Sequence, residues 1–433
     1  MSIIEALHCP GNPYLQHYRK TVSRFPGKME CLMIGQPVSP AAASAWKSWL
    51  QARRSPILLT LVGLFWASLY TYPTFMSPYL TELGSSPLMT GLVIGSYGLT
   101  QTILRLPAGI LSDHLRNKRL FIIAGLVASV ISATGLYLSR EVWLILVFRG
   151  LAGVAAAMWV HFTTLYLSYF PVQDTPQAMG RISFSNNLGT MAAMLAGSFL
   201  AQIKGWRYAF LLAIIIAVPS LVLSLAVQEE RPHAVPGGET RSRSSLRAAL
   251  SIGSDRTLLW TSILALLAQL VAFATVSGFV PQYASDLGAS KFELGLLSAF
   301  SLLPRALAAL LGGSLLARWF KLRSLVAFGF ALTGICTALL PLTRDLAWLF
   351  ANQFIGGIGI GLQMTILLAL CTRTVPVNRK ASAMGFFQSV YGIGMVAGPT
   401  LIGFLAQQFN LGTGFVMISG FSLLTAVLAI LVL

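Results

Sequence analysis

The sequence predicts an all-α integral membrane protein, in which two six-helix bundles are related by a parallel repeat. Three observations carry this prediction: the composition, a series of long apolar segments, and the similarity of the chain to itself. Hydrophobic residues make up 55% of the 433 residues and charged residues only 10%, and the mean hydropathy is +0.73, far above the range of globular domains.

A helix needs about 20 apolar residues to cross a hydrocarbon core of about 30 Å. Twelve segments of the chain meet this requirement. Their expected spans are 56–79, 88–112, 119–139, 142–168, 182–203, 206–227, 257–280, 292–317, 323–342, 345–370, 383–407 and 412–433.

The repeat appears when the chain is shifted against itself by 204 residues. Residues 71–86 (TYPTFMSPYLTELGSS) then align with residues 275–290 (TVSGFVPQYASDLGAS), and Gly153 aligns with Gly357. A unit of six helices is even, so both copies enter the membrane in the same orientation. The expected division is a cytoplasmic tail at 1–55, a first bundle at 56–228, a polar cytoplasmic linker at 229–256 and a second bundle at 257–433.

The net charge of +17 reflects orientation rather than a nucleic-acid partner. With the N-terminus inside, 22 of the 30 lysines and arginines fall on the cytoplasmic side and five outside. This asymmetry predicts a multi-pass protein of the cytoplasmic membrane with both termini cytoplasmic. The tail lacks the apolar region of a secretory signal, and its residues 41–54 (AAASAWKSWLQARR) suit a helix lying at the membrane interface.

Polar residues inside the predicted helices mark a passage, because such residues are costly in lipid and should face a cavity or another helix. The candidate substrate or coupling residues are Gln101, Arg105, Arg149, His161, Asn187, Gln269, Arg305, Gln353 and Gln388. Arg105 lies about 12 Å inward from Asp113 along a helix, and it could instead bind carbonyls or extend to the headgroups. His161 titrates near neutrality in water, although a lone helical histidine is more often structural.

All thirteen acidic residues lie in the tail, in loops or at helix ends. The three arginines within helices therefore face no acid at mid-membrane, and the passage should carry positive potential. Such a passage favours anionic or neutral amphipathic solutes over cations.

The stretch GILSDHLRNKRL (109–120) follows the second span and combines Gly109 and Asp113 with the bases Lys118 and Arg119. We expect Gly109 to allow close helix packing and Asp113 to accept hydrogen bonds from a neighbouring helix end. In the second copy Ala317 stands where Asp113 would be, so the function of the motif is expected to be asymmetric.

This motif, the paired bundles and the central linker resemble the major facilitator superfamily. The stretches RGLAG (149–153) and PYLTELG (78–84) are similar to motifs of its twelve-helix drug:proton antiporters. The resemblance implies that residues 109–120 stabilise an outward-facing state and that Arg149 participates in proton coupling. The helix at 182–203 departs from the antiporter pattern, with Ala193 and Met194 in place of a glycine-proline pair and Ser198 in place of a later glycine.

We therefore expect a secondary transporter that works by alternating access, with proton-coupled efflux of a drug-like, anionic or neutral amphipathic compound. The alternatives are an uptake carrier for a metabolite or organic anion, and a transporter-like sensor or scaffold that moves no solute. The sequence contains neither GxxxxGK[ST] nor HExxH, and its four cysteines form no CxxC pair. We expect no enzyme activity, metal or cofactor, and the expected partners of a monomer are a small solute, protons and the lipid bilayer.

Overall fold

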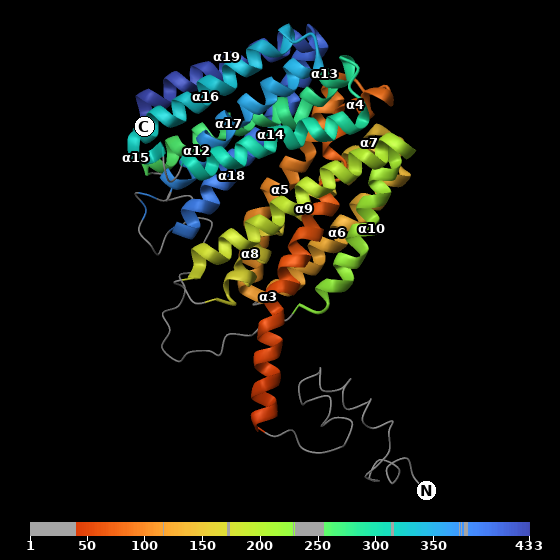
Figure 1. The fold of residues 1–433 in the computed structure, drawn as a ribbon, viewed down its shortest axis with the longest axis vertical. Coiled ribbons are helices and arrows are strands. Elements are labelled where there is room, and N and C mark those ends of the chain that lie inside the picture. Colours follow the sequence, from red (N-terminus) through yellow and green to blue (C-terminus); the bar gives the residue numbers. More distant parts are fainter. Residues whose placement is uncertain are drawn as a thin grey trace.

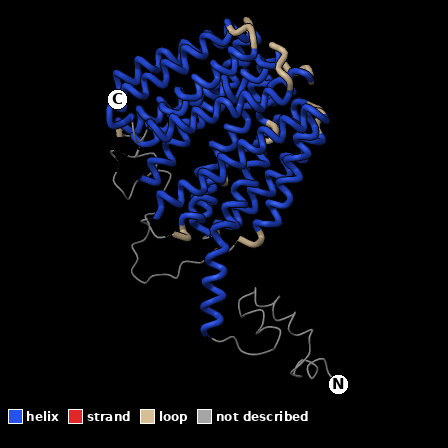
Figure 2. The backbone as a smooth tube through the Cα atoms, in the orientation of Figure 1, coloured by secondary structure: helices blue, strands red, loops and turns tan. Residues whose placement is uncertain are grey.

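Helices make up all the regular structure in the described part of the chain (Figure 2). The computed structural model describes residues 40–115, 117–170, 174–227, 229, 255–312, 316–371, 373, 375 and 380–433. Residues 230–254 of the linker expected at 229–256 and residues 1–39 of the tail expected at 1–55 lie outside these residues.

The first bundle contains eight α-helices and a short 3-10 turn. They are α3 (Pro40–Tyr70), η2 (Pro73–Phe75), α4 (Met76–Glu82), α5 (Pro87–Leu115), α6 (Lys118–Leu138), α7 (Val142–Ala157), α8 (Trp159–Leu167), α9 (Thr175–Lys204) and α10 (Trp206–Ser224).

The second bundle follows a similar order, with the short elements α15 and η6 added and the fourth span undivided. It consists of α12 (Arg256–Ala274), the π-helical turn η4 (Thr275–Phe279), α13 (Val280–Asp286), α14 (Lys291–Leu311), α15 (Ala317–Trp319), α16 (Leu322–Leu339), η6 (Leu340–Leu342), α17 (Leu346–Leu370), α18 (Lys380–Gln408) and α19 (Leu411–Val432).

Each of the twelve predicted spans falls on helices where its residues are described, and in the described residues ten helices are long and apolar enough to cross a membrane. The other two predicted spans fall on α5 and α9, which have 29 and 30 residues, and for these two the crossing stays a prediction. The fourth span is interrupted at Met158, between α7 and α8.

The segment 41–54 is helical as expected and continues into the first span as α3. The start of α3 projects beyond the bundle (Figure 1). The position of this segment at a membrane interface stays a prediction.

The repeat seen in the sequence is present in the packing. A Cβ atom on Gly153 of α7 would collide with the backbone oxygen of Tyr97 on α5. A Cβ atom on Gly357 of α17 would collide with the backbone oxygen of Ser301 on α14. Gly153 and Tyr97 each lie 204 residues before Gly357 and Ser301. Each bundle therefore packs its second span against its fourth at a glycine in the equivalent position.

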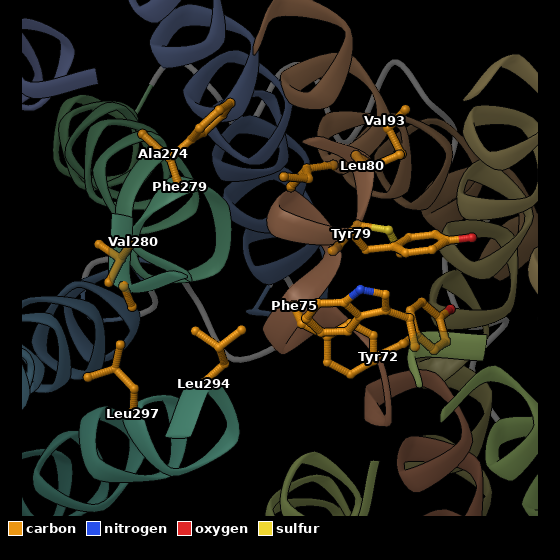
Figure 3. Packing of buried hydrophobic residues seen from close by; sticks show 14 of the residues in the cluster. Tyr72, Phe75, Tyr79, Leu80, Val93, Ala274, Phe279, Val280, Leu294 and Leu297 are labelled. Atoms are coloured by element: carbon orange, nitrogen blue, oxygen red, sulfur yellow. The ribbon is translucent and has the colours of Figure 1, made fainter. Parts of the chain in front are cut away.

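The ends of the helices are named here by the predicted topology, inner for cytoplasmic and outer for the opposite side. At the outer end, one apolar cluster contains residues of both bundles. Figure 3 shows residues of this cluster from both bundles, with Tyr72, Phe75 and Tyr79 of the first on one side of the view and Phe279 and Leu294 of the second on the other. The bundles therefore share one core at this end.

At the inner end the bundles have separate cores. One cluster belongs to the first bundle apart from Met395, and another belongs entirely to the second. Figure 1 shows the bundles meeting near α4 and α13 and diverging toward α8 and α15.

Small residues form the seam between the bundles, where α5 packs on α18 and α9 on α14. A Cβ atom on Gly91 would collide with the carbonyl of Pro399, and one on Gly295 would lie 3.1 Å from the backbone oxygen of Met194. Glycine is required at these positions because the two backbones touch.

Candidate functional site

Arg149 lies at the centre of the first bundle with 6% of its surface exposed. Small residues allow α7 to approach α5 closely beside it, and the hydroxyl of Thr100 donates a 2.6 Å hydrogen bond to the carbonyl of Gly150. The Arg149 guanidinium stands over the ring of Tyr97 at 4.4 Å and donates a 3.4 Å hydrogen bond to the hydroxyl of Tyr72. Aromatic faces and a hydroxyl thus stabilise this buried cation.

Arg105 connects the two bundles. It is half-buried on α5, and its guanidinium donates a 3.3 Å hydrogen bond to the hydroxyl of Tyr391 on α18. Tyr391 packs against the inner apolar clusters of both bundles, so this contact lies between them. Gln101, one turn from Arg105 on α5, is buried.

Arg305 reaches the same region from the second bundle. It lies on α14, half-buried, and interacts electrostatically with Tyr70 at the end of α3. Tyr70 in turn interacts with Tyr97, whose ring lies under the Arg149 guanidinium, and Tyr97 also interacts electrostatically with Arg105. The tyrosine pair therefore connects the three arginines that the sequence places within helices.

Within the described residues, no carboxylate forms an ion pair with Arg105, Arg149 or Arg305. The Nε atoms of Arg105 and Arg149 and the Oε1 atom of Gln101 are covered and have no hydrogen-bond partner. Buried groups of this kind carry a desolvation cost that a ligand can repay. The arrangement is positively charged and has unused donors and an unused acceptor.

Gln353 is the repeat-related counterpart of Arg149 and lies apart from the arginines. Its side chain donates a 3.2 Å hydrogen bond to Asn352, which donates at 2.8 Å to the carbonyl of Cys336. These residues line a cavity of about 10 Å³ between η4, α16 and α17, room for about one water molecule.

The remaining amides are less constrained. Gln269 on α12 and Gln388 on α18 are half-buried, and Asn187 on α9 is exposed. None of the three shares a hydrogen bond with the arginines in the described residues.

His161 is also separate from the arginines. It is 1% exposed, its ring lies parallel to that of Phe121 with centroids 4.7 Å apart, and its nitrogens lie 3.3 Å from the carbonyl oxygens of Met158 and Ala108. The Met158 carbonyl also accepts a 2.9 Å hydrogen bond from the backbone N–H of His161. This geometry fits the structural interpretation of the histidine.

The loop motif 109–120 is open in this structure. A Cβ atom on Gly109 would meet nothing within 4 Å, so the close helix packing expected at this glycine is absent. Arg119 instead contacts the end of its own bundle and the start of the linker. Its guanidinium donates to the carbonyl of Leu225 at 2.7 Å, and its backbone nitrogen donates to Glu229 at 3.0 Å. Lys118 begins α6, and the side chain of Asp113 lies outside the described part.

A contact that the sequence did not predict crosses the outer end. The Lys291 ammonium group lies 4.1 Å from the ring centroid of Trp206, and the indole N–H of Trp206 donates to Glu82. Lys291 begins α14 of the second bundle, whereas Trp206 and Glu82 belong to the first. Their positions at helix ends were visible in the sequence, but their pairing depends on how the bundles meet.

Comparisons with known proteins agree with this architecture. The model of the Major Facilitator Superfamily matches residues 57–290 and 264–433. An MFS-type transporter of Methanocaldococcus jannaschii is 22% identical over 82% of this chain and 92% of its own length. A probable sugar efflux transporter of Helicobacter pylori is 25% identical over 75% of this chain and 81% of its own.

The fold also matches solved structures. A bacterial homolog of the human lysosomal transporter Spinster, in an inward-facing and unoccupied conformation, superposes with a TM-score of 0.74 at 16% identity. The match covers 88% of this chain and 97% of the homolog.

Proposed function

Because the chain belongs to the major facilitator superfamily of membrane transporters, we propose that it carries a small anionic or neutral amphipathic solute by alternating access. One observation carries the choice of solute: Arg105, Arg149 and Arg305 converge on a tyrosine pair, with no carboxylate paired to them in the described residues. A cation would be repelled from such a site, whereas a carboxylate or phosphate would neutralise it.

The proposal includes an inward-facing state. The shared outer cluster and the separate inner clusters support it, because a solute at the arginines would then have access from the cytoplasm only. Solutes taken up from the cytoplasm and released outside fit an exporter, and the sugar efflux transporters among the relatives favour the same direction.

Proton coupling and a monomeric state complete the proposal. The passage offers no acid for a proton among the three arginines, so protonation is assigned to the loop motif with Asp113 or to the solute itself. A neutral sugar is the second candidate solute, because several relatives carry that name.

The test compares solute classes on the purified protein in lipid nanodiscs. Thermal unfolding is measured with carboxylates, organic phosphates, organic cations and neutral sugars, and we expect stabilisation by anions. Arg305→Ala should weaken the Kd of a stabilising anion about tenfold, or ~1.4 kcal/mol, and Arg305→Lys should weaken it less. Stabilisation by cations, or an unchanged Kd in Arg305→Ala, would contradict an anion site at these arginines.

Transport itself is measured in proteoliposomes with an imposed pH gradient. Flux of the stabilising solute that follows the gradient supports proton coupling. A binding protein without any flux would instead indicate the sensor or scaffold alternative.

A further inference from the structure

Four aromatic side chains gather beside the arginines. The rings of Trp66 and Tyr70, on successive turns of α3, have centroids 5.8 Å apart. The rings of Trp66 and Trp159 meet edge to face at 5.4 Å and 76°. Tyr391 packs against the same inner cluster of the first bundle. Trp66, Tyr70, Trp159 and Tyr391 are called here the aromatic group.

The aromatic group is joined directly to the arginines. Tyr391 accepts a 3.3 Å hydrogen bond from Arg105, and Tyr70 interacts electrostatically with Arg305. Flat apolar faces and guanidinium groups therefore lie in one region, contributed by both bundles.

Exposure separates this group from aromatic residues that face lipid. Trp143, on the same span as Trp159, is 70% exposed. Tyr70, Trp159 and Tyr391 are half-buried and pack on the inner cluster of the first bundle, at the level where the two bundles diverge. Trp66 is 7% exposed, and its indole N–H is covered without an acceptor.

We propose that the solute is a planar aromatic acid, an inference that rests on the anion transport proposed above. Its acid group binds Arg105 and Arg305, one from each bundle, and its ring packs against the faces and edges of the aromatic group. Guanidinium groups pair with carboxylates in a planar, bidentate geometry and also stack on aromatic rings. An edge-to-face ring pair raises the binding affinity about three- to tenfold beyond the contribution of the apolar area that it buries.

This binding mode explains two features together. The unused Nε atom of Arg105 is a donor without an acceptor, which the acid group would satisfy. A ligand held by Arg105 and Arg305 at once would also connect the two bundles, so its binding would change the free energy of their relative movement.

Four probes of one size separate the contributions of ring and charge. They are 2-naphthoate, its saturated analogue decahydro-2-naphthoate, the neutral 2-naphthamide and the cation 2-naphthylmethylammonium. Binding is measured by calorimetry on the full chain in nanodiscs. We expect the Kd of 2-naphthoate to be about three- to tenfold lower than that of its saturated analogue, with weaker binding of the amide and none of the cation.

Two variants localise the effect. Trp159→Leu should remove the preference for the aromatic acid while the saturated acid binds as before, and Trp159→Phe should retain most of it. Trp143→Leu, at a lipid-exposed tryptophan of the same span, is the matched control and should leave both Kd values unchanged. Thermal unfolding without ligand confirms that each variant is folded.

The outcomes separate this inference from the anion site itself. Equal Kd values for the two acids would overturn the aromatic preference and leave the anion site standing. Equal Kd values for 2-naphthoate and 2-naphthamide would overturn both the aromatic preference and the anion site. Absence of any naphthoate binding would overturn the inference, while binding of organic phosphates or saturated acids would still support an anion carrier.

Discussion

The outer end of this molecule is closed and the inner end is open, and different kinds of contact are found at the two ends. At the outer end the bundles share an apolar cluster, a glycine seam and the Lys291–Trp206 contact. At the inner end each bundle has its own cluster, and Gly109 faces open space. The closed end thus depends on shape and apolar packing, whereas the charged loop motif 109–120 lies at the end that is open.

The comparison teaches which residues set the conformational equilibrium. A contact made in only one state shifts the populations by its own free energy, and every 1.4 kcal/mol is a factor of about ten. Substitutions at the outer end should therefore lower the inward-facing population, and substitutions in the loop motif should act on the opposite state.

The largest effect is expected for Gly91→Val. The added side chain would collide with the backbone of Pro399, and the collision cannot be relieved by a side-chain rotation, so α5 and α18 must separate. Overpacking of this kind costs about 1–3 kcal/mol, enough to open the outer end in a large share of molecules. Distances between spin labels at the exposed positions Ser86 and Asp286 should lengthen.

Gly420→Val is the matched control for this variant. A Cβ atom at Gly420 on α19 would meet nothing within 4 Å, so the label distance should stay as in the parent protein. An unchanged distance in Gly91→Val would show that the seam does not hold the outer end closed.

Asp113→Asn is expected to have the next largest effect. If the loop motif stabilises the outward-facing state, the loss of one charge should reduce flux several-fold while the protein still folds, because a hydrogen bond to a charged group contributes about 1.5–3 kcal/mol. Flux in proteoliposomes and thermal unfolding are measured together. Normal flux would show that the acid is dispensable, and a large drop in Tm would assign it to stability instead.

Lys291→Met tests the charged contact at the outer end. Methionine retains much of the apolar stem but removes the cation over Trp206, a contact worth about 0.5–1 kcal/mol at an exposed site. The outward-facing population should rise about two- to fivefold in the spin-label measurement. Lys204→Met, at the nearby end of α9, is the control, because Lys204 has no cation–π contact in the described residues. Equal changes in the two variants would mean that net charge, and not the Trp206 contact, is responsible.

Much of the fold followed from the sequence, because apolar length and the repeat are local or periodic properties. The helical spans and the paired glycines at 153 and 357 needed no knowledge of tertiary contacts. The burial of Gln101 and Arg149 likewise followed from the cost of polar groups in lipid. Their roles in binding or coupling stay predictions.

Other features depend on how segments distant in the sequence meet. The interruption at Met158 has no glycine or proline at the break, so tertiary packing selects it. The π-helical turn at Thr275–Phe279 contains Gly278, but a glycine alone does not specify a π-helical turn, so packing selects its form as well. The Trp206–Lys291 contact joins two helix ends from different bundles. The open environment of Gly109 belongs to one state of a transporter, and a motif in a sequence does not specify which state is populated.

The smallest effect on this equilibrium is expected for His161→Gln. The histidine packs on Phe121 and joins the carbonyl regions of α5 and α8 within one bundle, so it does not cross the surface that opens and closes. Glutamine retains a donor but loses the ring contact, and the expected cost is about 1 kcal/mol of stability with little change in the label distance. The pH profile of flux decides between the two interpretations of this residue. An unchanged profile at lowered Tm supports a structural histidine. A shifted profile would instead give His161 a role in proton coupling. The opening of the inner end would then depend on charge, as the proposed binding of solute in the passage does.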